Sequence, residues 1–318
     1  MRRTATALMA ALALAAVQAC AQKAAVDVIA ADGALCDITR RLAASNLKVD
    51  CLLGPSDDPH QLQLTPEQTR HLSQAQLVLI NGYGLTPALD KLSQAVKVAE
   101  IAVQSSPNLN DDGENDDHSH AEHSDGHAHG DQDPHVWHDP RQAAAMVKLV
   151  STTLEPLQPQ AAQAIRSRAD AMQRSLSALD RWNREQFSTI PSPRVLASGH
   201  RAFASLARAY QFKELPVVDA TSTSEALRPQ ALARVVAELR SQGVRSLFAE
   251  QMPASKALER ISNLSGVPLA GQPLRADSGG DNLMATLTSN TCLIVDALGG
   301  RCNQASAADL VQRWNAIR

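Results

Sequence analysis

Short apolar runs alternate with segments of helical periodicity in the first third of the chain. The run at 77–80, Leu-Val-Leu-Ile, has no polar position, which is typical of a parallel strand buried on both faces. The other apolar runs of strand length lie at 26–30, 47–53 and 96–99. Helical patterns lie at 36–44, 66–73 and 86–92. This alternation predicts an α/β lobe with a mostly parallel sheet covered on both faces.

The same alternation returns in the last 125 residues. Apolar runs of strand length lie at 194–197, 215–218, 244–249 and 267–270. Helical patterns lie at 202–210, 229–242, 255–264 and 282–298. The helix at 229–242 has a proline in its first turn and Gly243 just past its end, which are common start and stop signals. We therefore expect a second α/β lobe of similar design.

Between these regions the pattern stays helical from 140 to about 187. Pro156 and Pro159 divide it, and the part that follows is long, charged and free of glycine and proline. We expect one long rigid helix within 156–188. It would join an N-terminal lobe at 22–155 to a C-terminal lobe at 189–318.

The N-terminus has the features of an export signal. Two arginines follow Met1, an apolar run covers about 5–17, and small residues follow it. This predicts a signal peptide at 1–21, cleaved after Ala19 or Ala21, and a periplasmic protein. The sequence around Cys20 also resembles a lipid-attachment site, but Gln18 fits that pattern poorly. The soluble periplasmic form is therefore favoured over a lipid anchor at Cys20.

Four cysteines remain after such a cleavage: Cys36, Cys51, Cys292 and Cys302. An even number in an exported protein favours two disulfides, which allows three connectivities. The expected pairing is the sequence-local one, Cys36 with Cys51 and Cys292 with Cys302. Because no CxxC pair is present, a cysteine zinc site is disfavoured.

Charge and histidine content narrow the function. The chain has 30 Lys and Arg against 33 Asp and Glu, and this net charge of −3 disfavours a nucleic-acid partner. The segment 105–133 has almost no apolar residues, so we expect an acidic, His-rich mobile loop there. It holds five of the ten histidines, which favours an accessory metal-collecting role over a solvated linker: His118, His120, His123, His127 and His129.

Three further histidines stand in distinctive local sequences. Asp58-Pro59-His60 and Asp133-Pro134-His135 each place a carboxylate two residues before the imidazole. Such a carboxylate can accept a hydrogen bond from the second ring nitrogen, which fixes the tautomer and makes the ring a better metal ligand. His200 follows Ser198-Gly199 at a predicted turn from strand to helix.

These motifs resemble the cluster A-I metal-binding receptors of bacterial ABC transporters, and among them the ZnuA-like zinc receptors. The resemblance covers the mature chain, and its most specific part is Asp-Pro-His-Val-Trp-His-Asp-Pro at 133–140. The other matching stretches lie at 54–60, 77–84, 199–203 and 247–250. The resemblance implies two α/β lobes bridged by one long helix, with a metal ion held in the cleft between them.

The resemblance also implies a ligand set. His60 and His135 would bind the metal from the first lobe and His200 from the second, with Asp277 as the fourth ligand. Asp281, Glu250 or water are the alternatives for the fourth position. His138 stands where the family usually has an apolar residue, either as an extra metal contact or as a side chain near the mouth of the site.

Three imidazoles with at most one carboxylate form a donor set that suits Zn²⁺, whereas Mn²⁺ prefers more oxygen ligands. The resemblance points the same way, since manganese receptors of this family tend to have an acid where His200 stands. A zinc hydrolase is disfavoured because the chain has no HExxH helix and the ligand set looks closed. The expected function is a monomeric zinc receptor, not an enzyme, that serves an ABC permease and its ATPase. The alternatives are a manganese or other divalent-metal receptor, and a zinc buffer or adhesion protein without a transporter.

Overall fold

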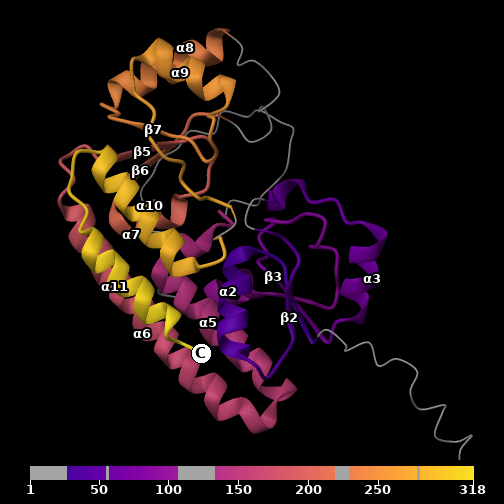
Figure 1. Ribbon diagram of the computed structural model, residues 1–318. Coiled ribbons are helices and arrows are strands. Elements are labelled where there is room, and N and C mark those ends of the chain that lie inside the picture. The colour runs from indigo at the N-terminus through magenta and orange to yellow at the C-terminus, as the bar shows by residue number, and fades with distance from the viewer. Residues whose placement is uncertain (1–26, 55–56, 107–132, 219–228, 278–279) are drawn as a thin grey trace, which may run out of the picture.

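The computed structural model describes residues 27–54, 57–106, 133–218, 229–277 and 280–318 (Figure 1). The predicted signal peptide at 1–21, Cys20 and the five clustered histidines lie outside these residues. The described chain forms two α/β lobes, each built on a parallel sheet, and this confirms the predicted fold class. No helix within the described ranges is both long and apolar enough to cross a membrane.

The first sheet has four parallel strands in the order β2-β1-β3-β4. Alternate positions of its two central strands enter different cores: Val28 and Leu79 lie in one, Ile29 and Val78 in the other. The sheet is therefore covered on both faces, as its apolar strands predict. The strands are β1 (Val28–Ala30), β2 (Val49–Cys51), β3 (Leu77–Ile80) and β4 (Ala95–Lys97), and the helices are α2 (Gly33–Ala43), α3 (Pro66–Gln74) and α4 (Val98–Gln104).

The second sheet has three parallel strands in the order β6-β5-β7. Leu196 and Phe248 face one core and Ala197 and Leu247 the other, so this sheet too is buried on both sides. The strands are β5 (Val195–Ser198), β6 (Lys213–Pro216) and β7 (Leu247–Phe248), and the helices are α7 (Ala204–Tyr210), α8 (Pro229–Ser241) and α9 (Lys256–Ser265).

One helix of 27 residues, α6 (Ala162–Ser188), runs from one lobe to the other (Figure 1). One face of α6 is buried in the core around the first sheet, whereas Phe187 lies in the core of the second. The buried residues of that face are Ile165, Ala169, Met172, Leu176, Leu179 and Trp182. It follows α5 (Pro140–Leu154) and two short 3-10 turns that contain Pro156 and Pro159. Because both ends of α6 are packed, it can act as a rigid connection between the lobes.

The chain ends in two helices that return toward the first lobe, α10 (Leu283–Ala297) and α11 (Gln304–Asn315). Leu287 and Trp314 from these helices lie in the core around the first sheet, although they fall within the predicted C-terminal lobe. The boundaries at 155 and 189 stay a prediction.

Three local predictions from the sequence were wrong, and one helix was missed. Residues 86–92 form successive hydrogen-bonded turns rather than a helix. The apolar run 96–99 is divided, because β4 ends at Lys97 and α4 begins at Val98; a short apolar run fits a buried helix as well as a strand. The run 267–270 forms only an isolated bridge between Leu269 and Leu247. Helix α11 was not predicted at all.

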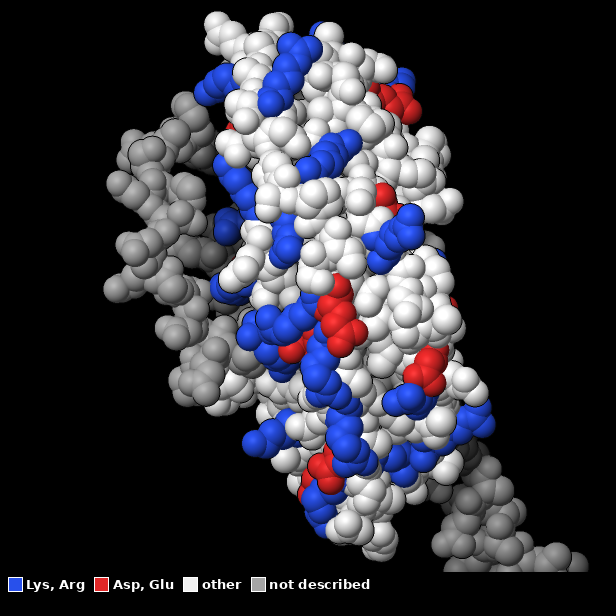
Figure 2. Space-filling model, turned by 90° about the vertical axis from the view of Figure 1, so that its left-hand side faces the viewer, with Lys and Arg blue, Asp and Glu red and all other residues white. Residues whose placement is uncertain are grey.

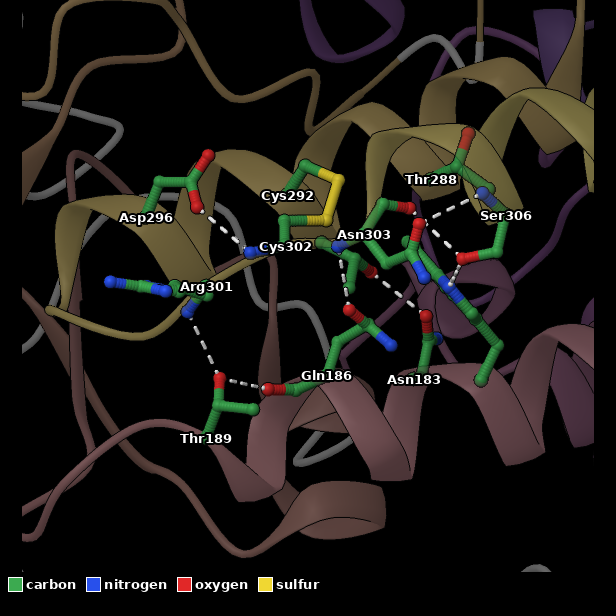
Figure 3. The surroundings of a disulfide bond; sticks show 12 residues. Asn183, Gln186, Thr189, Thr288, Cys292, Asp296, Arg301, Cys302, Asn303 and Ser306 are labelled. Atoms are coloured by element: carbon green, nitrogen blue, oxygen red, sulfur yellow. Dashed lines mark hydrogen bonds between the residues drawn. A yellow bond between two sulfur atoms is a disulfide. The ribbon is translucent and has the colours of Figure 1, made fainter.

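Both disulfides have the expected sequence-local pairing, Cys36 with Cys51 and Cys292 with Cys302. The first joins α2 to β2, and the second joins α10 to the segment before α11 (Figure 3). Next to the second, the backbone N–H of Asn303 donates to Gln186 and that of Arg301 donates to Thr189 (Figure 3). These contacts fasten the turn between α10 and α11 to the C-terminal end of α6.

We expect a Cys36→Ala/Cys51→Ala double variant to lose about 3 kcal/mol of unfolding free energy, the value for a closed loop of this size. The loss arises because the disulfide joins residues 15 positions apart, and the unfolded chain gains conformational freedom when this bond is removed. Urea unfolding followed by circular dichroism measures it. A variant as stable as the parent protein would show that this link does not constrain the unfolded chain.

The surface charge is uneven. Lys and Arg outnumber Asp and Glu on the face shown in Figure 2, which is the side of the molecule that carries α6 and α11. Exposed basic residues of α6 include Arg166, Arg174, Arg181 and Arg184. By contrast, eight acidic residues lie between 107 and 132. The net charge of −3 is therefore the sum of regions of opposite sign.

Candidate metal centre

Four side chains that are far apart in the sequence meet between the two lobes: His60, His135, His200 and Asp277. His60 lies in the 3-10 turn η1 (Pro59–Gln61), where Asp58 accepts a hydrogen bond from its backbone N–H. His135 immediately precedes the turn η3 (Val136–His138). His200 follows the carboxyl end of β5, and Asp277 follows Ala276 in the second core.

The three imidazoles converge on a single carboxylate oxygen. Oδ1 of Asp277 lies 2.9 Å from Nε2 of His135, 3.1 Å from Nε2 of His200 and 3.2 Å from Nε2 of His60. The Nε2 atoms of His60 and His135 are 3.3 Å apart. With metal–ligand bonds of about 2.0–2.1 Å, neighbouring ligand atoms of a tetrahedral zinc site stand roughly 3.3 Å apart. The spacing of these atoms therefore suits one small tetrahedral cation.

A buried carboxylate orients His135. Oδ1 of Asp133 lies 2.7 Å from Nδ1 of His135 and also accepts a hydrogen bond from its backbone N–H. The bond at Nδ1 leaves Nε2 to face the centre, as the Asp-Pro-His motif predicts. Burial raises the pKa of Asp133, but the neighbouring His135 outweighs this and lowers it to about 2. Asp133 is thus an anion that holds the ring of His135 in place.

Glu250 does the same for His200. Its carboxylate accepts a hydrogen bond from the backbone N–H of His200 and lies 2.5 Å from Nδ1 of the ring. Gly199 permits this approach, since a Cβ there would lie 3.1 Å from the carboxylate. Glu250 was one candidate for the fourth ligand, but it lies behind the ring and outside the four-residue group. Its supporting role was not predicted, because no local motif joins residues 200 and 250.

The other candidate, Asp281, also lies outside this group. It lines a pocket with Asp37 and Arg40, next to the Cys36–Cys51 disulfide. Of the three carboxylates considered for the fourth position, Asp277 is the one that meets the imidazoles. The five clustered histidines, His118 to His129, lie outside the described residues.

One interpretation of the sequence placed His138 near the mouth of the site, but the structure buries it. Its side chain is 1% exposed, and Nε2 lies 2.9 Å from the carbonyl oxygen of Ala276. Burial, together with the positive charge of His135, lowers the pKa of His138 to about 4, so the ring is neutral. The sequence gives no sign of this burial, which depends on contacts from the second lobe.

Proton affinities at the centre are strongly shifted. Burial lowers the pKa of His135, but Asp133 and Asp277 outweigh it and raise the pKa to about 9. Burial also lowers the pKa of His200, while Asp277 and Glu250 raise it to about 11. Burial raises the pKa of Asp277, but hydrogen bonds from the three rings bring it well below its usual value. The carboxylates therefore favour a positive charge at His135 and His200, from either a proton or a bound metal ion.

Three known proteins resemble this chain over most of its length. The metal-binding protein YtgA of Chlamydia trachomatis is 27% identical in sequence over 86% of each chain. The Fe(III)-bound structure of YtgA has a TM-score of 0.74 at 24% identity and covers 87% of this chain and 99% of that one. The manganese-binding lipoprotein MntA of Halalkalibacterium halodurans is 25% identical over 78% of each. The periplasmic zinc-binding protein TroA of Treponema pallidum has a TM-score of 0.71 at 25% identity, covering 85% of this chain and 98% of that one.

A model of the protein family described as zinc-uptake complex component A, periplasmic (ZnuA), matches residues 28–297. The match spans both sheets, the long helix and all four residues of the centre. The chain therefore belongs to the ZnuA family of periplasmic metal-binding receptors of ABC-type metal uptake systems.

Proposed function

We propose that this protein is a high-affinity receptor for Zn²⁺ in the periplasm, with His60, His135, His200 and Asp277 as the ligands. The observation that carries the proposal is the convergence of three imidazole Nε2 atoms on one carboxylate oxygen. Three nitrogens and one oxygen at tetrahedral spacing form a donor set typical of zinc. No catalytic role is proposed.

The identity of the metal rests on this donor set and not on the relatives. The three relatives are named or described as binding manganese, zinc and Fe(III). Mn²⁺ is a harder cation that favours carboxylates, carbonyls and water over imidazole. Only Asp277 in the four-residue group supplies oxygen, which favours zinc over manganese.

Capture would take place between the lobes. His60 and His135 come from the side of the first sheet, whereas His200 and Asp277 come from the side of the second. An ion bound by the two first-lobe ligands and the two second-lobe ligands together loses its water ligands and links the lobes. Release would require the pairs to separate, and we propose that this happens when the receptor, as a monomer, docks on the permease that its ATPase drives. Export would depend on the signal peptide at 1–21.

The test is titration of the metal-free protein with Zn²⁺ and with Mn²⁺, in parallel, by competition with a chelator. We expect one tight Zn²⁺ site and Mn²⁺ binding that is at least about 100-fold weaker, as the donor set indicates. Tighter binding of Mn²⁺ would contradict the zinc assignment. A second test measures zinc uptake by cells that lack the gene. Uptake that is lost in these cells, and returns with the intact gene, would identify a transport receptor and exclude a zinc buffer or an adhesion protein.

We propose that the histidines at 118–129 collect zinc weakly and do not form the tight site. Deleting residues 113–130 should leave one tight site per chain and remove the additional, weaker zinc equivalents, because the four residues of the centre lie elsewhere. Isothermal titration of the parent protein and the deletion variant measures both stoichiometries. Loss of the tight site in the deletion variant would show that the centre needs this segment.

A further inference from the structure

The residues around His135 are anchored in the first lobe. Val136 and Trp137 are fully buried in the core around the first sheet. His135 lies between Asp133 and His138, which are 7% and 1% exposed. All three polar side chains are therefore held by a short segment, residues 133–138, that is fixed to the first lobe.

One end of the 133–138 segment is bonded to the element that follows His200. Oδ2 of Asp133 accepts a hydrogen bond of 2.9 Å from the backbone N–H of Ala204, the first residue of α7. Oδ1 of the same carboxylate holds the ring of His135. Asp133 thus connects a first-lobe histidine to the beginning of a second-lobe helix.

The other end is bonded to the element that carries Asp277. Because the carbonyl oxygen of Ala276 can only accept a hydrogen bond, Nε2 of His138 carries the proton and donates it over 2.9 Å. The ring of His138 also packs against Phe203 of the second lobe, with 4.7 Å between centroids. Ala276 directly precedes Asp277, so this contact fixes the backbone next to the carboxylate.

We propose that His138 is a positioning residue that holds the Asp277 segment against the first lobe and so slows the release of the bound metal. This inference rests on the proposed function. Any separation of the two lobes would break the bond from His138 to Ala276. The ring is 1% exposed, so no water is in place to take over this hydrogen bond, and a buried donor left unpaired costs free energy. Because the bond crosses between the lobes, it stabilises the arrangement in which they meet and so lowers the dissociation rate of the metal.

The experiment compares His138→Leu with His138→Gln. Leucine keeps apolar volume but cannot donate, whereas the amide of glutamine can reach the same carbonyl oxygen. We measure the dissociation rate of Zn²⁺ from the loaded protein by stopped-flow mixing with excess chelator. We expect His138→Leu to release zinc about tenfold faster, the effect of one lost buried hydrogen bond, and His138→Gln to stay within about threefold of the parent protein.

A spectroscopic readout separates positioning from a general loss of packing. The visible absorption of the Co²⁺-loaded protein reports the ligand geometry, and we expect it to change in His138→Leu and to return in His138→Gln. His71→Leu is the matched control, because His71 pairs with Asp50 on the surface away from the centre. This variant should keep the rate and the spectrum of the parent protein.

Two results would overturn the inference: equal zinc release from His138→Leu and the parent protein, or equally fast release from both His138 variants. In either case one tight zinc site in all variants would leave the proposed function intact. Failure of the parent protein to bind zinc would remove the proposed function and this inference together.

Discussion

Replacing His135 with alanine is expected to weaken zinc binding by roughly 100- to 1000-fold. Zinc sites with four protein ligands bind with about 10–16 kcal/mol, or about 2.5–4 kcal/mol for each ligand, and this sets the scale of the loss. His135 is 1% exposed and its Nε2 lies 2.9 Å from the proposed carboxylate ligand. Water could fill the vacated position, but it would bind the cation less strongly than imidazole.

The measurement is chelator competition on the folded variant, with circular dichroism to confirm the fold. His60→Ala and His200→Ala should show losses of similar size, since their Nε2 atoms face the same oxygen. His71→Ala is the control for removing a histidine from the first lobe. Unchanged zinc affinity in all three ligand variants would refute the assigned centre.

The histidines of the centre could be found from the sequence because each stands in a local pattern. His60 and His135 share the Asp-Pro-His motif, and His200 follows a glycine at the end of a strand. The structure brings these three together from separations of 75 and 65 residues. Asp277 lies in an irregular segment with no such pattern, so only the family resemblance pointed to it.

The remaining features depend on contacts between distant segments. Val98 and Ala99 fit a buried strand and a buried helix equally well, so the apolar run does not show that β4 ends before them and α4 begins with them. Glu250 supports His200 only because β7 pairs with β5. His138 is buried because Phe203 and Ala276 of the second lobe cover it. A polar residue in one lobe gives no local sign that the other lobe will close over it.

Zinc affinity should fall steeply as the pH is lowered, by up to about 100-fold for each pH unit below 9. Against the effect of burial, the nearby carboxylates raise the pKa of His135 to about 9 and that of His200 to about 11. Below pH 9 both rings therefore hold a proton in the metal-free protein. Imidazolium cannot bind a metal, so each zinc ion must displace two protons. The affinity consequently rises with pH and is lost toward acid.

Two measurements check this proton count. The logarithm of the zinc association constant, measured between pH 6 and pH 8, should rise with a slope near two. Calorimetry in buffers of different ionisation enthalpy should give about two protons released per zinc ion. In Glu250→Gln the slope should fall toward one at a lower pH than in the parent protein, because the carboxylate of Glu250, after that of Asp277, raises the pKa of His200. A slope below one in the parent protein would mean that the rings are already neutral before zinc arrives. In that case Asp133 and Glu250 would orient the rings of His135 and His200 without raising their pKa values enough to keep them protonated.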